Sequence, residues 1–138
     1  MKTERISLCL IFILCNVLVL NAQETIHISL GDREDATCEI RETLMKSRSD
    51  QVKIIFERGV YYCLPDYANE KYCVISNHGN GTKKILFSLA NYKTIEIIGN
   101  GATLLFHGRI MPFLFENCQS VKIKGLTINW DIPFTFLG

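Results

Sequence analysis

NYKTIEIIG at residues 91–99 recurs as NCQSVKIKG at residues 117–125, a shift of 26 residues. The asparagine, a threonine or serine, the β-branched pair and the glycine stay in register, and Phe87 and Phe113 extend the match toward the amino terminus. A period of roughly 20 to 50 residues built from short strands is typical of a solenoid whose coils bury one face against their neighbours. The sequence therefore predicts an all-β fold, a right-handed parallel β-helix. One coil should hold about three strands, near residues 94–98, 102–106 and 112–115.

Alternation within these strands predicts which side chains face the interior. The inward set is Ile95, Ile97, Val121, Ile123, Leu126, Ile128 and Trp130. For Trp130 this favours burial in the core over a sugar-stacking platform. The register also predicts that Ile97 stacks on Ile123, that Glu96 lies beside Lys122 on the adjacent strand, and that Asn91 stacks on Asn117 at a shared corner.

The first 22 residues read as a secretory signal peptide, with Lys2 and Arg5 ahead of an apolar run over residues 6–20. That run is shorter than the roughly 20 apolar residues of a membrane span, so we expect no membrane span after cleavage and a secreted or periplasmic protein. Residues 23–138 carry equal numbers of basic and acidic side chains. This neutrality argues against a nucleic-acid partner.

Residues 23–50 read as an amino-terminal strand followed by a capping helix. The helix is predicted over residues 36–47, with Asp32 or Asp35 as N-cap and an apolar stripe through Ile40 and Leu44 that covers the open first coil. Residues 51–138 then form the first coils of the β-helix. Because no capping helix or polar last coil follows the second repeat, we expect the chain to be truncated.

Four cysteines follow the predicted signal peptide, namely Cys38, Cys63, Cys73 and Cys118. An oxidising compartment would permit disulfides, with Cys63 and Cys73 as the favoured pair; four separate buried thiols are the alternative. No cysteine or histidine cluster has metal-ligand spacing, so neither a metal nor another cofactor is expected.

Polar clusters at residues 76–81, 107–109 and 129–131 interrupt the strands. His78 and Asn80 are either turn residues or ligand-binding groups, and Asn80 also opens an N-glycosylation acceptor sequence. In the second cluster, Arg109 offers a planar fork of donors to sugar hydroxyls or a carboxylate. Alternatively, Arg109 caps a coil carbonyl or pairs with Glu116.

Four segments together resemble a known family. They are FERGVY at residues 56–61, KYCVISNH at 71–78, FHGRIMPF at 106–113 and INWDIP at 128–133. In this order they are similar to the amino-terminal part of the α-1,3-galactosidases of glycoside hydrolase family 110, which are secreted β-helix enzymes. Gly79 departs from the acidic residue expected after the Ser-Asn-His run.

The resemblance implies hydrolysis, with inversion, of terminal α-1,3-linked galactose on blood-group B type or linear glycans. It implies a glycan substrate. The substrate-binding residues that we predict come from the polar clusters at strand ends and turns, namely His78, His107, Arg109 and Asp131. Family members carry their catalytic acids on later coils, so no catalytic residue is assigned. An inverting glycosidase needs two carboxylates about 6.5–9.5 Å apart, so we expect the chain alone to be inactive.

Two other functions fit the predicted fold. A polysaccharide lyase would need a Ca²⁺ site and a lysine or arginine base, and no dense aspartate cluster supports one. A non-catalytic adhesin or glycan-binding solenoid fits the fold equally well, because fold does not decide function.

Overall fold

A computed structural model describes residues 22–31, 35–76 and 79–132. The predicted signal peptide over residues 1–22 lies outside these ranges except for its last residue, and so does His78. The described strands are β1 (Glu24–Ile28), β2 (Gln51–Phe56), β3 (Val60–Cys63), β4 (Asn69–Cys73), β5 (Gly81–Ala90), β6 (Thr94–Phe106), β7 (Met111–Glu116) and β8 (Ser120–Trp130). Helix α2 (Ala36–Lys46) and the 3₁₀ turn η1 (Pro65–Tyr67) complete the list. The predicted all-β class is confirmed, with a single α-helix in this part of the chain.

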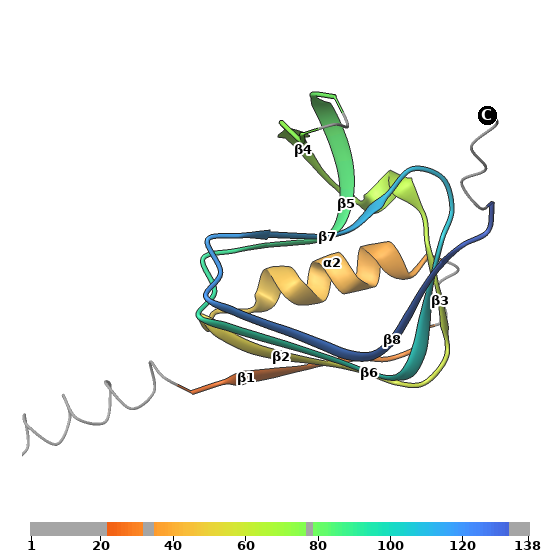
Figure 1. Cartoon of the computed structure of the whole chain (residues 1–138). Coiled ribbons are helices and arrows are strands. Elements are labelled where there is room, and N and C mark those ends of the chain that lie inside the picture. The colour runs from red at the N-terminus through yellow and green to blue at the C-terminus, as the bar shows by residue number, and fades with distance from the viewer. Residues whose placement is uncertain (1–21, 32–34, 77–78, 133–138) are drawn as a thin grey trace, which may run out of the picture.

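The strands form two sheets. In the first, β1, β2, β6 and β8 follow one another as parallel neighbours, and β3 pairs with the second half of β6. In the second, β5 pairs with β7 in parallel and with β4 in antiparallel orientation, so the sheet is mixed. Figure 1 looks along the stack, so β2, β6 and β8 trace one outline and the β4–β5 hairpin projects from it.

Strand β6 is one bent strand, whereas the sequence predicted separate strands at 94–98 and 102–106. Its inward side chains are fully buried on both sides of the bend. The bend follows from a register shift between Ile98 and Ala102, where Asn100 and Gly101 take positive φ values of 50° and 81°. A side chain at Gly99 would lie 2.3 Å from the carbonyl oxygen of Gly125, so only glycine lets β6 and β8 approach here.

The pairing predicted from the 26-residue match is confirmed. Ile97 lies opposite Ile123 in the β6–β8 ladder. Asn117 Nδ2 donates to Asn91 Oδ1 at 2.8 Å, and both asparagines have left-handed backbones, with φ of 51° and 65°. Asparagine tolerates this conformation better than other residues with a side chain, which explains its position at both corners.

Glu96 has the neighbour that the repeat predicts and two closer cations besides. Lys122 does lie opposite Glu96 in the ladder, but the closest ammonium groups belong to Lys124 at 3.1 Å and Lys53 at 3.6 Å. Lys124 is two residues farther along the same strand, within the diagonal reach of a long side chain. The predicted register is confirmed, and the contacts of Glu96 with Lys124 and Lys53 add to it.

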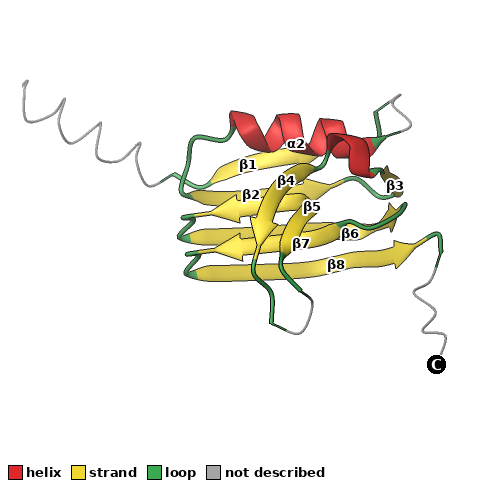
Figure 2. Ribbon diagram, turned by 90° about the horizontal axis from the view of Figure 1, so that it is seen from above, coloured by secondary structure: helices red, strands yellow, loops and turns green. Residues whose placement is uncertain are grey.

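Helix α2 forms where the sequence placed it. Asp35 is the N-cap, accepting from the Thr37 amide at 2.8 Å, and it also accepts from the Leu64 amide at 3.2 Å. Ile40 is fully buried and Leu44 packs against the core. Figure 2 shows the helix alongside β1, at the opposite end of the stack from β8. The predicted N-cap Asp32 lies outside the described residues.

The predicted disulfide between Cys63 and Cys73 is wrong. Both are free thiols, as is Cys118. Cys63 ends β3 and points into the core, where burial, followed by the charge of Asp35, raises its pKa to about 12. Cys73 ends β4 in the other sheet, and its Sγ is directed at the Lys71 carbonyl oxygen at 3.7 Å. Their short separation in sequence does not bring them together because they belong to different sheets.

Candidate functional site

His107 and Asp131 meet where two paired strands end. Phe106 and Trp130 are the last partners in the β6–β8 ladder, so the residues that follow them are neighbours. His107 Nδ1 lies 2.7 Å from Asp131 Oδ2, and each side chain is 32% exposed. The backbone continues the pairing, because the Asp131 amide donates to the Phe106 carbonyl oxygen at 3.1 Å. The structure thus brings together two of the site residues predicted from sequence.

The contact defines what the histidine can offer to a ligand. An ionised carboxylate only accepts, so Nδ1–H donates to Asp131, and in the neutral imidazole Nε2 is then the nitrogen that accepts from a hydroxyl. Tyr62 stacks on the His107 ring, with centroids 5.7 Å apart and planes at 29°, which holds the ring from a second side. An oriented imidazole with one open nitrogen is suited to hydrogen bonding with a sugar hydroxyl.

Sequence reasoning missed Tyr62. It lies on β3 opposite Leu105 of β6, and it is 48% exposed. Its outward position could be read from the alternation of Val60, Tyr61, Tyr62 and Cys63, but its proximity to His107 depends on the β3–β6 register. No local pattern encodes that register.

Arg109 lies beside the dyad in sequence but faces a separate hollow. The hollow has a volume of about 640 Å³. Its lining comes from the β4–β5 hairpin, the start of β7 and the end of β8, namely Ile75, Thr82, Lys83, Lys84, Arg109, Ile110, Met111 and Trp130. Asp131 is adjacent to Trp130, so the dyad and the hollow share the end of β8.

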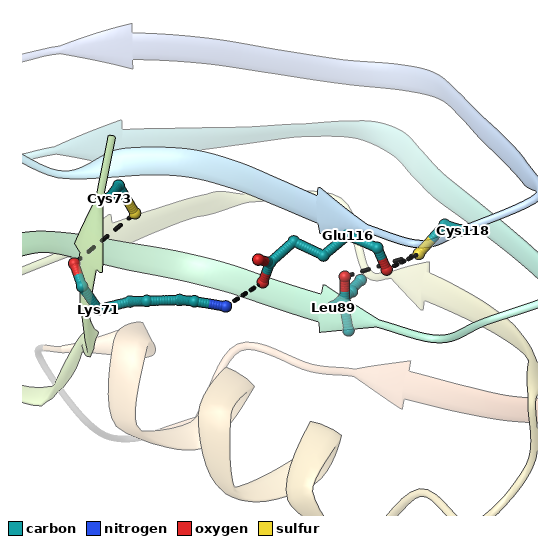
Figure 3. A network of polar contacts seen from close by, with 5 residues as sticks. All are labelled: Lys71, Cys73, Leu89, Glu116 and Cys118. Carbon is teal, nitrogen blue, oxygen red and sulfur yellow. Dashed lines mark hydrogen bonds and ion pairs between the residues drawn. The ribbon is translucent and has the colours of Figure 1, made fainter. Parts of the chain in front are cut away.

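The proposed pairing of Arg109 with Glu116 does not form. Glu116 instead forms an ion pair with Lys71, which joins β4 to the end of β7 (Figure 3). Beside it, Cys118 Sγ contacts the carbonyl oxygens of Leu89 and Glu116 at 3.6 and 3.4 Å. These contacts tie the β4–β5 hairpin to the parallel strands and leave Arg109 available to a ligand.

Trp130 packs against the core and also lines the hollow. It packs against the core, with its ring 5.4 Å from that of Phe106, as the inward alternation predicted. It is also only partly buried and lines the hollow. The predicted burial of Trp130 is therefore confirmed in part, because the residue packs on the core and is also partly exposed at the hollow.

The carboxylates along β6, β7 and β8 are all engaged. Glu96 contacts Lys124 and Lys53, Glu116 contacts Lys71, and Asp131 contacts His107. Hydrogen bonding to Lys124 is the main cause that lowers the pKa of Glu96. A general acid must hold a proton near neutral pH, so Glu96 does not suit that task.

The described ranges hold neither a metal-binding cluster nor a membrane-spanning helix. No group of three or more histidine, cysteine or acidic side chains is arranged to hold a metal ion. No helix there is long and apolar enough to cross a membrane.

Comparisons with known proteins give a consistent result, although no family model matches the chain. It is 31% identical over 116 residues to alpha-1,3-galactosidase A of Shewanella woodyi, covering 78% of this chain and 19% of that protein. It is 31% identical over 86 residues to alpha-1,3-galactosidase B of Bacteroides thetaiotaomicron, covering 62% and 14%. It is 28% identical over 115 residues to alpha-1,3-galactosidase B of Akkermansia muciniphila, covering 82% and 14%. The resemblance read from the sequence is confirmed, and the chain spans less than a fifth of these relatives.

Proposed function

We propose that this chain, which resembles the α-1,3-galactosidases over most of its length, is the amino-terminal part of a secreted exo-α-1,3-galactosidase. The whole enzyme would remove terminal α-1,3-linked galactose, with inversion, from blood-group B type or linear glycans. The observation that carries the proposal is the similarity across 78% of the chain to a protein named alpha-1,3-galactosidase. In this proposal, the chain supplies substrate-binding groups. The catalytic groups lie in segments that correspond to the later parts of the longer relatives.

The proposed architecture is the opening of a right-handed parallel β-helix. Three observations support it. Strands β1, β2, β6 and β8 pair in parallel in that order, β5 pairs in parallel with β7, and Asn117 donates a hydrogen bond to Asn91. A crystal structure of a longer gene product tests this. A further strand paired in parallel with β8 at Ile123 is expected, and an antiparallel or unrelated neighbour would refute the β-helix.

His107 and Asp131 are the proposed sugar-binding dyad. Asp131 orients the imidazole, and Nε2 then accepts from a galactose hydroxyl. His107→Ala removes the acceptor, whereas Asp131→Asn keeps the shape and removes the charge that fixes the ring. Both should weaken binding of α-1,3-galactobiose by up to about tenfold, the upper end of the net value of one hydrogen bond between neutral groups. Lys46→Gln, on the exposed end of helix α2, is the control.

Activity is tested beside binding. The chain is incubated with α-1,3-galactobiose and galactose release is followed, with the Shewanella woodyi relative as the positive control. We expect binding without turnover, because the carboxylates of β6 to β8 are engaged by cations or by His107. Turnover at a rate comparable to the relative would disprove the assignment of catalysis to other segments. Equal affinity for α-1,3- and α-1,4-galactobiose would argue instead for a less specific glycan-binding protein.

A further inference from the structure

The hollow beside the dyad carries an excess of positive charge. Of the three cationic side chains that line it, Lys84 Nζ is paired with Glu70 Oε1 at 2.6 Å. Across residues 22–31, 35–76 and 79–132, no carboxylate pairs with Lys83 or Arg109. The protein as a whole has a net charge of only +1, so this excess is local.

The rest of the lining is apolar and includes an aromatic ring. Ile75, Ile110 and Met111 form one part of the wall, and Trp130 forms another. A volume of about 640 Å³ is within the range of sites for small molecules, which typically combine apolar walls with a few fixed polar groups. An indole face suits the apolar side of a sugar ring, and the cations beside it suit an oxyanion.

The cations come from two segments held against each other. Arg109 precedes β7, whereas Lys83 and Lys84 lie on β5, in the part of the hairpin that extends past the β7 pairing. The Lys71–Glu116 ion pair anchors the other strand of that hairpin to the end of β7 (Figure 3). The geometry therefore keeps Lys83 and Arg109 on one hollow, which is the arrangement needed to hold one anionic group from two directions.

We propose that this hollow binds the anionic group of an acidic glycan, either a sulfate ester or a carboxylate on the substrate. Arg109 and Lys83 hold the oxyanion, and Trp130 packs against the sugar ring that carries it. The inference rests on the proposed function for the glycan nature of the ligand, and it goes further by assigning its charge. A neutral galactoside offers the two cations only hydroxyl oxygens, whereas an anionic one offers a charged acceptor and adds Coulombic attraction to each hydrogen bond.

Trp130 provides a direct readout, because it is the single tryptophan of the sequence. Its fluorescence is followed during titration with α-1,3-galactobiose, the same disaccharide carrying a sulfate ester, and a sialylated galactoside. Calorimetry under the same conditions gives the affinity independently. The anionic ligands should bind at least about tenfold more tightly than the neutral one, with the difference shrinking as salt is added. The tighter of the two anionic ligands identifies whether sulfate or carboxylate is preferred.

Variants assign the effect to the hollow. Lys83→Gln should remove most of the preference for the anionic ligand while leaving binding of the neutral disaccharide unchanged. Arg109→Gln should weaken binding of the anionic ligand more than binding of the neutral disaccharide, because Arg109 can also donate to sugar hydroxyls. Lys46→Gln, which removes a lysine on the other side of the stack, should change neither. Circular dichroism confirms that each variant keeps its strand content.

The outcomes separate this inference from the proposed function. Equal affinity for the sulfated, sialylated and neutral ligands would overturn the inference and leave the galactosidase assignment untouched. Failure of the anionic ligands to bind or to change Trp130 fluorescence at millimolar concentration would also overturn it. If sulfated α-1,3- and α-1,4-galactobiose bind equally tightly, the result would support the anion site and count against the α-1,3-galactoside specificity.

Discussion

Strands β6 and β8 share a pattern and differ in environment. Ile97 of β6 is fully buried, whereas Ile123, its partner in the β8 ladder, is 40% exposed. The same holds for Leu104, fully buried, and Ile128, 40% exposed. Strand β6 has β2 or β3 on one side and β8 on the other, whereas β8 pairs only with β6 in the described part of the chain.

The comparison separates two properties that a sequence pattern combines. Alternation determines the face on which a side chain lies, and this is the same for Ile97 and Ile123. Burial depends on what covers that face, and this differs between the two strands. The same residue in the same repeat position can therefore contribute very differently to stability.

The largest expected effect tests this difference directly. Ile97→Ala leaves a cavity among close-packed neighbours and should lower the free energy of unfolding by about 2–5 kcal/mol. Ile123→Ala removes a side chain that is already 40% exposed, and it should cost about 1 kcal/mol or less. Urea unfolding of both variants gives the two losses. Equal losses would mean that β8 is covered in solution, for example by a second molecule.

The asparagine corner gives a smaller effect. Asn117→Ala loses the hydrogen bond to Asn91 and forces alanine into a left-handed backbone with φ of 51°, so we expect a loss of about 1–2 kcal/mol. Asn117→Gly loses the same hydrogen bond without the backbone strain, and its loss should be smaller. If the two variants unfold at the same urea concentration, backbone strain is not what selects asparagine at this corner.

The 26-residue repeat made the pairing of β6 with β8 predictable from the sequence. A match at a fixed shift predicts which residues lie opposite each other, and the pairings of Ile97 with Ile123 and Asn91 with Asn117 followed from it. It could not predict the exposure of Ile123, because exposure depends on the next neighbour rather than on the strand itself.

Contacts outside the repeat were harder to predict. The Lys71–Glu116 ion pair joins residues 45 apart in sequence, and it depends on where the β4–β5 hairpin folds. The same fold places Cys63 and Cys73 in different sheets. His107 and Asp131 were both predicted as binding residues from their clusters, but their contact required the β6–β8 register to extend past the strand ends.

At the other edge of the sheet, helix α2 lies alongside β1, and the residues after the helix bind the first residue of that strand. Glu24 Oε2 accepts from the Ser47 hydroxyl at 2.9 Å and from the Arg48 and Ser49 amides at 2.9 and 3.2 Å. The hydrogen bond from the Arg48 amide is the main cause that lowers the pKa of Glu24 below its ordinary value of 4.5. The β1 edge thus has hydrogen bonds to a neighbouring segment, whereas in the described residues no segment lies on the outer side of β8.

Glu24→Gln should lower the free energy of unfolding by about 1 kcal/mol at neutral pH, the net value of a hydrogen bond to a charged group after allowance for exposure. A lowered folded-state pKa means that Glu24 stabilises the protein above pH 4.5 and that this stability is lost as pH falls through the folded value. Urea unfolding from pH 7 to pH 3 should show the two proteins converging. A difference that persists at pH 3 would mean that shape, not charge, accounts for the loss.

The smallest expected effect concerns Glu96 of β6. Its strand pairs with the covered strand β2 on one side and with the exposed strand β8 on the other. Hydrogen bonding to Lys124 of β8 is the first cause of its lowered pKa, with smaller contributions from the charges of Lys124, Lys53 and Lys122. Lys124→Met should therefore raise the Glu96 pKa further toward its ordinary value than Lys53→Met does. Because the folded pKa is lowered, the associated stability is present above pH 4.5 and is lost as pH falls below it.

NMR titration of the Glu96 carboxyl group measures the pKa change in both variants. Urea unfolding at low and high salt measures how much Lys124→Met lowers the free energy of unfolding. That loss should be smaller than for Glu24→Gln and should disappear at high salt, because Lys124 is 52% exposed and solvent ions screen its charge. A larger pKa change for Lys53→Met would place the effective partner on β2, the covered side. In that case β2 would contribute more than the exposed strand β8 to the electrostatics of β6, and the difference between the two neighbouring strands would extend from burial to charge.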